Sequence, residues 1–194
     1  YSSLDRFCMK KRLIAVAFTT ALASSMACAQ TPVMFSTINN TNAPKDNVVH
    51  GVRLSVLHGK VSEVQGVDFS LLGMSESDRT TGVNFNIAFG ANKVNQEMTG
   101  VSFGWFNWNT GKTTGANLGL ANITHDVNGL NWSAVNYSTG TTVADVGLVS
   151  LSNQSTVQVG IFNHTKHIDA VQVGLINCAD NGFLKCFPIV NFPK

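Results

Sequence analysis

The sequence predicts an all-β protein that is built from a short repeat and folded as a β-solenoid. The phrase V-x-V-G-[IL]-[FI]-N occupies residues 157–163 and returns fourteen residues later at 171–177. The same frame recurs with more drift upstream, and a fixed period this short predicts about nine copies of one small stacked unit. The spacings between central apolar residues are 15, 16, 18, 15, 14, 14, 13 and 14. These central residues are Leu54, Phe69, Phe85, Phe103, Leu118, Trp132, Val146, Val159 and Val173.

Residues 9–29 are expected to be a secretory signal peptide. Met9 precedes three basic residues, an apolar run over 13–18, and a cleavage motif of small residues that ends at Ala29. This order is typical of export signals, and the run is too short to span a membrane comfortably. An acylated Cys28 would instead make the chain a lipoprotein. We interpret residues 1–8 as upstream sequence or an artefact.

The chain that remains after cleavage is expected to be one domain. Residues 30–50 contain two prolines and an Asn-Thr cluster, and we expect an N-terminal entry segment or cap there. The repeats run over 51–179, and the apolar segment 180–194 breaks the pattern as a terminal cap does. Nine Lys and Arg and ten Asp and Glu remain after residue 29, giving a net charge of about −1. No basic stripe is present, so nothing points to nucleic acid.

Each unit reads as a strand followed by a turn. In Val83-Asn84-Phe85-Asn86-Ile87 the apolar residues alternate with polar ones, as in a half-buried strand. We expect the apolar face to form the core, with the core side including Trp105. Turn residues such as those at 138–141 separate the strands. In five units an asparagine lies four places after the central residue. If the units stack, these asparagines should form a ladder of amide hydrogen bonds. This expected ladder consists of Asn107, Asn122, Asn136, Asn163 and Asn177.

Two ways of stacking the unit remain open. In a parallel solenoid, equivalent residues lie above one another at about 4.8 Å. In an antiparallel up-and-down barrel, of the kind found in outer membranes, each unit would supply one strand and a tight turn. The barrel would have a thin apolar band, because the strand around Phe103 offers three outward apolar residues. The repetition of single strands also favours the solenoid.

A disulfide between Cys178 and Cys186 is the next prediction. Both cysteines lie after the signal peptide, and the segment 179–182 between them has the composition of a turn. An exported compartment permits the bond. Two buried free thiols are the alternative.

The sequence offers no constellation of catalytic residues, and we expect neither an enzyme nor a cofactor or metal site. His164 and His167 have a spacing that metals can use, but they lie in a turn without a ligand cluster. Asp68, Asp145 and Asp169 are expected on solvated positions rather than as an acid-base pair.

An aromatic cluster over 103–108 is the strongest candidate for a binding surface. Phe106 and Trp108 face away from the expected core side, so they form a candidate binding strip for a glycan, a lipid or a protein partner. Core filling with a second packed face is the alternative interpretation.

The chain resembles the surface-repeat proteins of Gram-negative bacteria, whose units read G-[VL]-Q-[VI]-G-L-[IV]-N. The similarity is strongest over 168–192, where Val171-Gln172-Val173-Gly174-Leu175-Ile176-Asn177 is followed by a terminal apolar segment. The similarity is weaker early in the chain, where the units over residues 69–90 lack the asparagine four places after the central residue. The resemblance implies a location in the cell envelope and no established activity.

These observations predict an exported, envelope-associated protein with a structural or adhesive role. It would reside in the periplasm, in the outer membrane or on the cell surface. Its partner would be an envelope or host-surface protein, glycan or lipid, and self-association is possible. The alternative function is that of a small outer-membrane barrel acting as a pore or an anchor.

Overall fold

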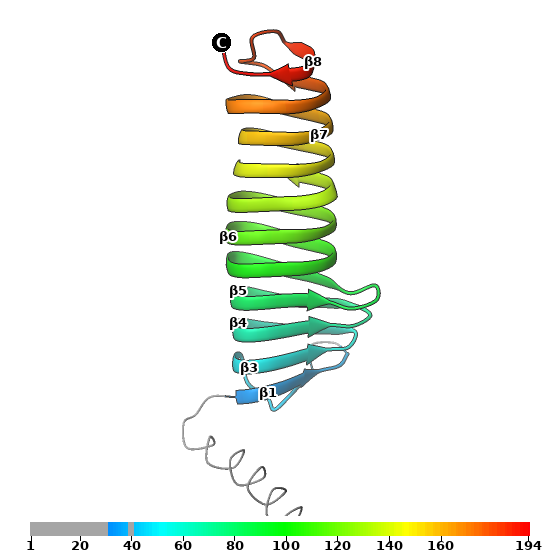
Figure 1. Cartoon of the computed structure of the whole chain (residues 1–194). Coiled ribbons are helices and arrows are strands. Elements are labelled where there is room, and N and C mark those ends of the chain that lie inside the picture. The colour runs from blue at the N-terminus through cyan, green and yellow to red at the C-terminus, as the bar shows by residue number, and fades with distance from the viewer. Residues whose placement is uncertain (1–30, 39–40) are drawn as a thin grey trace, which may run out of the picture. The chain divides into compact units, whose positions relative to one another are not determined.

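The computed structural model describes residues 31–38 and 41–194 as a β-solenoid with stacked coils (Figure 1). The expected signal peptide over 9–29 and the segment 1–8 lie outside these residues. The strands are β1 (Thr31–Ser36), β2 (Asn42–Ala43), β3 (Val48–Ser55), β4 (His58–Ser70), β5 (Met74–Asn86), β6 (Ala91–Ser138), β7 (Thr141–Ala179) and β8 (Cys186–Asn191).

Parallel pairing between successive coils decides between the two stacking alternatives. β1 pairs with β3, β3 with β4, β4 with β5, β5 with β6, and β6 with β7, all in parallel. The central residues align in this register, as in the row from Leu54 through Phe69 and Phe85 to Phe103. The solenoid prediction is confirmed, and an up-and-down arrangement of these strands is excluded because consecutive strands would then be antiparallel.

The two ends of the stack differ from its body. β1 lies within the segment expected to be a cap, and it supplies a strand in register with β3 while the short β2 pairs antiparallel to it. At the other end β8 pairs antiparallel to β7, so it occupies the edge that the last coil exposes. Covering such an edge prevents its unpaired backbone groups from pairing with another chain.

A column of glycines makes one corner of the coils. Gly66 has φ of +137°, and a Cβ there would lie 2.0 Å from the carbonyl oxygen of Gly51. Gly82 stands in the same relation to Gly66, and Gly100 to Gly82. A residue with a side chain would be strained in this conformation and would clash with the coil below. The glycines therefore permit the close stacking at this corner.

The orientation of the two faces is the reverse of the prediction. Phe103, Trp105 and Trp132 are 46%, 47% and 60% exposed, although apolar residues of this kind were expected to form the core. Most of the buried residues instead carry amides or hydroxyls, together with a few charged residues such as Arg53 and Asp145 and a smaller set of apolar residues such as Met98. Period-two alternation separates two faces but does not say which face is inside. Hydrophobicity, which usually decides this, gave the wrong answer here.

Candidate functional site

The interior of the later coils contains the asparagine ladder. Asn107 donates from Nδ2 to Oδ1 of Asn122 at 2.9 Å, and Asn122 donates to Oδ1 of Asn136 at 3.1 Å. Asn163 donates to Asn177 at 2.7 Å, and Ser150 takes the corresponding position between the two runs. The five asparagines are at most 1% exposed. Within each run the hydrogen bonds between equivalent amides offset the cost of burying them. At the interruption, the hydroxyl of Ser150 and Oδ1 of Asn163 are buried without a partner.

A second column of buried polar residues stands immediately before the central residues. Asn117 donates to Asn131 at 2.9 Å, and Asn131 donates to Oδ1 of Asp145 at 2.9 Å. In the last coils Gln172 donates to Gln158 at 2.7 Å. The sequence shows this column of polar residues, but its place inside the coils was missed. The signal that could have revealed it is that amide-bearing residues recur at one position in successive units.

Asp145 is buried in this second column, so the prediction of a solvated position for it was wrong. Its Oδ2 accepts hydrogen bonds from Thr142 at 2.5 Å and from Ser155 at 3.1 Å. Burial raises the pKa of its carboxyl group, while the hydrogen bonds from Thr142, Asn131 and Ser155 act in the opposite direction. These hydroxyls and amides surround the carboxyl group, and none of them is a base or a nucleophile activated by one.

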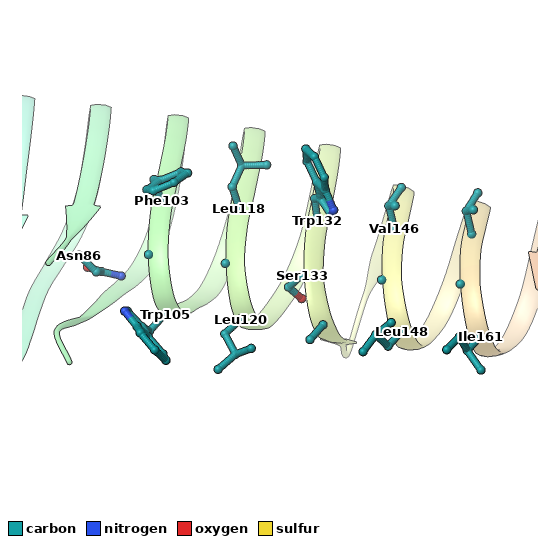
Figure 2. A pocket seen from close by; sticks show the side chains of 16 residues that line it. Asn86, Phe103, Trp105, Leu118, Leu120, Trp132, Ser133, Val146, Leu148 and Ile161 are labelled. Carbon is teal, nitrogen blue, oxygen red and sulfur yellow. The ribbon is translucent and has the colours of Figure 1, made fainter. Parts of the chain in front are cut away.

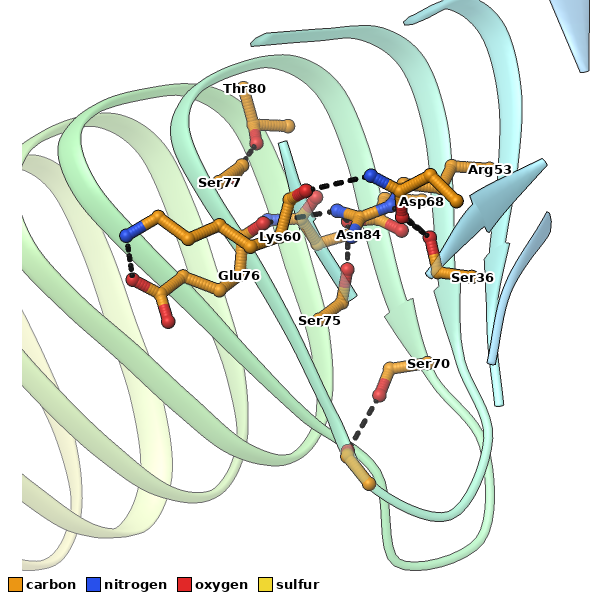
Figure 3. Close-up of polar contacts among 12 residues, drawn as sticks. Ser36, Arg53, Lys60, Asp68, Ser70, Ser75, Glu76, Ser77, Thr80 and Asn84 are labelled. Carbon is orange, nitrogen blue, oxygen red and sulfur yellow. Dashed lines mark hydrogen bonds and ion pairs between the residues drawn. The ribbon is translucent and has the colours of Figure 1, made fainter. Parts of the chain in front are cut away.

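Asp68 is also buried rather than solvated, next to Arg53 (Figure 3). The Nη1 atom of Arg53 lies 3.5 Å from Oδ2 of Asp68 and donates to the carbonyl of Glu76 at 3.1 Å. Ser75 donates to Oδ2 of Asp68 at 2.6 Å. Burial raises the pKa of Asp68, although the charge of Arg53 opposes this rise. The pair occupies the interior of the early coils, where it neutralises two buried charges.

Asp169 lies apart from both buried carboxylates. Its Oδ1 is 3.4 Å from Nε2 of His167, and it accepts hydrogen bonds from Gln154. The three aspartates therefore do not form an acid-base pair. Among the residues that the structure describes, no group of three or more His, Cys, Asp or Glu could hold a metal ion, and this includes His164 and His167.

The outer surface divides lengthwise into an apolar side and a polar side. We use the term apolar arc for a set of nine-residue stretches, one in each coil. Each stretch begins three places before the central residue of its coil. Lys, Arg, Asp and Glu occur in these stretches only as Arg53, Asp68 and Asp145, which are at most 2% exposed. The stretches are 51–59, 66–74, 82–90, 100–108, 115–123, 129–137, 143–151, 156–164 and 170–178.

The stretches between them, which we call the polar edge, carry the other charged residues of the coils. Glu76 there lies 3.1 Å from Nζ of Lys60 and 3.6 Å from Nζ of Lys93. The charged residues of the polar edge are Lys60, Glu63, Glu76, Asp78, Arg79, Lys93, Glu97, Lys112, Asp126, Lys166 and Asp169.

Within the apolar arc the surface is hollowed into a groove of about 900 Å³ that crosses five coils (Figure 2). One wall is the central row Phe103, Leu118, Trp132, Val146 and Val159, and the other is the row two places later in each coil. That second row consists of Trp105, Leu120, Ala134, Leu148 and Ile161. The residue between the two rows is glycine in four of the five coils and Ser133 in the other. These small residues form the floor of the groove, which therefore lies below the side chains of the two walls.

The groove was not predicted, and the predicted strip lies beside it. Phe106 and Trp108 are 49% and 43% exposed, as a binding strip requires, but Trp105 is exposed as well. Nζ of Lys93 lies 5.1 Å from the ring centroid of Trp108, which places Trp108 next to the polar edge. The strip is therefore part of the apolar arc rather than a separate face.

Cys178 and Cys186 form a disulfide that joins the last coil to β8. Their two strands are paired at the same position, because Cys178 and Cys186 are partners in the register. The bond ties the terminal strand to the body of the solenoid.

No family model, curated protein or solved structure matches this chain. No helix within the described residues is long and apolar enough to cross a membrane.

Proposed function

We propose that this protein is a non-catalytic structural protein of the cell envelope that binds membrane lipid through its apolar arc. The observation that carries the proposal is the absence of exposed Lys, Arg, Asp and Glu from the arc in nine successive stretches. Soluble proteins rarely expose contiguous apolar surface of this extent, and such surface marks a contact with a membrane or a protein. The predicted export signal and the surface-repeat resemblance are the grounds for proposing a location in the envelope.

Lipid is the partner that the surface chemistry fits best. The backbone groups of the inner coils pair with the coils on either side, so they need no partner from outside. The polar edge would stay in water while the arc enters the apolar region, as in an interfacial amphipathic helix. Trp105, Trp108, Trp132 and Tyr137 all lie on the arc, and Trp and Tyr are enriched where proteins meet the membrane interface.

Vesicle flotation tests this proposal. The full chain, mixed with phosphatidylcholine vesicles, is expected to float with them, and added salt should not release it because the contact is apolar. Val135→Lys with Ile176→Lys places two charges on exposed positions of the arc outside the groove. We expect this variant to bind at least about tenfold more weakly, since a charge in lipid costs a few kcal/mol.

The matched control is Thr139→Lys with Gln96→Lys. Thr139 and Gln96 are both exposed residues of the polar edge. This control adds the same charge and should float like the unmodified chain. Failure of the unmodified chain to float, or equal flotation of both double variants, would contradict the proposal.

A further inference from the structure

We propose that the groove binds one extended acyl chain of a membrane phospholipid, lying along the stack of coils. This inference deepens the proposed function and rests on it, because the open side of the groove would then face the lipid phase. The groove crosses five coils, which corresponds to about 19 Å at the spacing of strands. Half the hydrocarbon core of a bilayer, the depth of one layer of acyl chains, is about 15 Å.

The lining of the groove offers few hydrogen-bonding groups. The indole N–H groups of Trp105 and Trp132 can donate. The other polar side chains of the lining are Asn86 and Ser133, whose donors are used within the solenoid, while Oδ1 of Asn86 is buried without a partner. Asn86 donates to the carbonyl of Phe106 at 2.9 Å, and Ser133 donates to Val135 at 2.6 Å. A peptide or a glycan placed here would leave polar groups without partners, which is costly. A hydrocarbon chain has no such groups.

The shape of the groove is set by residue size. Gly119, Gly147 and Gly160 line the floor of the groove without side chains. The bulky side chains of Leu120 and Leu148 project along one side of the groove (Figure 2). A Cβ at Gly147 would lie 2.1 Å from the carbonyl oxygen of Ser133, so this floor cannot accept larger residues without moving the coils. The result is an apolar channel that is open on one side and follows the stack of coils.

Fluorescence quenching tests the inference. The chain has three tryptophans, and Trp105 and Trp132 line the groove while Trp108 does not. In a Trp108→Phe background, a short-chain phosphatidylcholine with a brominated acyl chain is added as monomers, without vesicles. We expect saturable quenching at one lipid per protein chain.

Two alanines of the arc provide a matched pair of variants. Ala134 lines the groove, whereas Ala144 lies on the arc outside it, and both are partly exposed. Ala134→Phe should fill the middle of the groove and weaken lipid binding at least tenfold, while Ala144→Phe should leave it unchanged. Circular dichroism should show that both variants remain folded.

The outcomes separate this inference from the proposed function. Two results would overturn the acyl-chain site even if the protein floats with vesicles. One is quenching that does not saturate, and the other is equal lipid binding by the chain with and without Ala134→Phe. Saturable binding by a chain that fails to float would support the site and contradict the membrane role. Binding of an apolar peptide in place of the lipid would also overturn the inference.

Discussion

The early and the late coils differ in the side chains that fill their interiors. In the early coils, separate strands β3, β4 and β5 are joined by loops, and the interior holds an apolar cluster that includes Met34 and Val64 beside the Arg53–Asp68 pair. In the late coils, β6 and β7 run through 48 and 39 residues, and buried amides stack on one another.

The difference follows the spacing of the repeat. Central residues lie 15 to 18 places apart up to Phe103 and 13 to 15 places apart after it. With nearly constant spacing the same residue type falls at the same place in each coil, so amides can form ladders. Buried side-chain atoms without a partner among the described residues occur in both regions, for example Oδ1 of Asp68 in the early coils and Oδ1 of Asn163 in the late coils. Regular length allows equivalent amides to pair, and the interruption of the ladder at Ser150 leaves the next amide oxygen without a partner.

The largest expected effect comes from the glycine corner. Gly115 has φ of +135°, and a Cβ there would lie 1.9 Å from the carbonyl oxygen of Gly100. Gly115→Ala should lower the free energy of unfolding by about 4 kcal/mol through strain and overpacking. In the last coil the corresponding residue is already Ala170, so Ala170→Gly should cost about 1 kcal/mol or less. Urea unfolding measures both, and similar losses in the two variants would contradict this account of the corner.

The next effect tests whether ladder amides stabilise the late coils. Asn122 donates to Asn136 and to the carbonyl of Asn117, and it accepts from Asn107. Asn122→Ala should lower the free energy of unfolding by about 3 kcal/mol, because buried partners lose their hydrogen bonds.

Ser55 in an early coil supplies the contrast for Asn122. Its hydroxyl is buried without a partner, so Ser55→Ala should be neutral or slightly stabilising. Urea unfolding of the two variants side by side provides the measurement. A larger loss for Ser55→Ala than for Asn122→Ala would show that the ladder is not what holds the late coils together.

A smaller effect is the pH dependence of stability that the two buried carboxylates, Asp145 and Asp68, should cause. Burial raises the folded-state pKa of Asp145, so stability should fall as pH rises from about 3.9, the unfolded value, through the folded pKa. Asp145→Asn removes this loss, and its amide can still accept from Asn131 while the hydroxyls of Thr142 and Ser155 reorient. We expect the variant to gain about 1 kcal/mol at pH 7 and nothing below about pH 3.9.

Asp68→Asn should show the same direction of pH dependence, because burial raises the folded-state pKa of Asp68 as well, against the opposing charge of Arg53. Thermal unfolding between pH 3 and pH 8 measures both variants. A loss of stability in either variant that grows as pH rises from about 3.9 to 7 would contradict the burial of that carboxyl group.

The sequence contains enough information for the fold but not for the orientation of its faces. The recurrence of Val-Gln-Val-Gly with an asparagine four places after the centre predicts parallel stacking, and the structure has it. The placement of Trp132 outside and Asn131 inside could not be predicted from alternation, because both arrangements have the same period. The groove was equally hidden, since it depends on Gly147 and Leu148 lying beside equivalent residues of the neighbouring coils.

The orientation of the faces is the central claim, and cysteine labelling tests it most directly. Leu148 is 55% exposed and Ser150, two residues later in β7, is fully buried. In a chain with Cys8 and Cys28 replaced by Ser, Leu148→Cys and Ser150→Cys are treated with N-ethylmaleimide, an uncharged reagent that also enters lipid and detergent. We predict that Leu148→Cys reacts nearly as fast as the unfolded chain and that Ser150→Cys is protected until unfolding. Protection of Leu148→Cys together with rapid labelling of Ser150→Cys would contradict the account and return the apolar residues to the core.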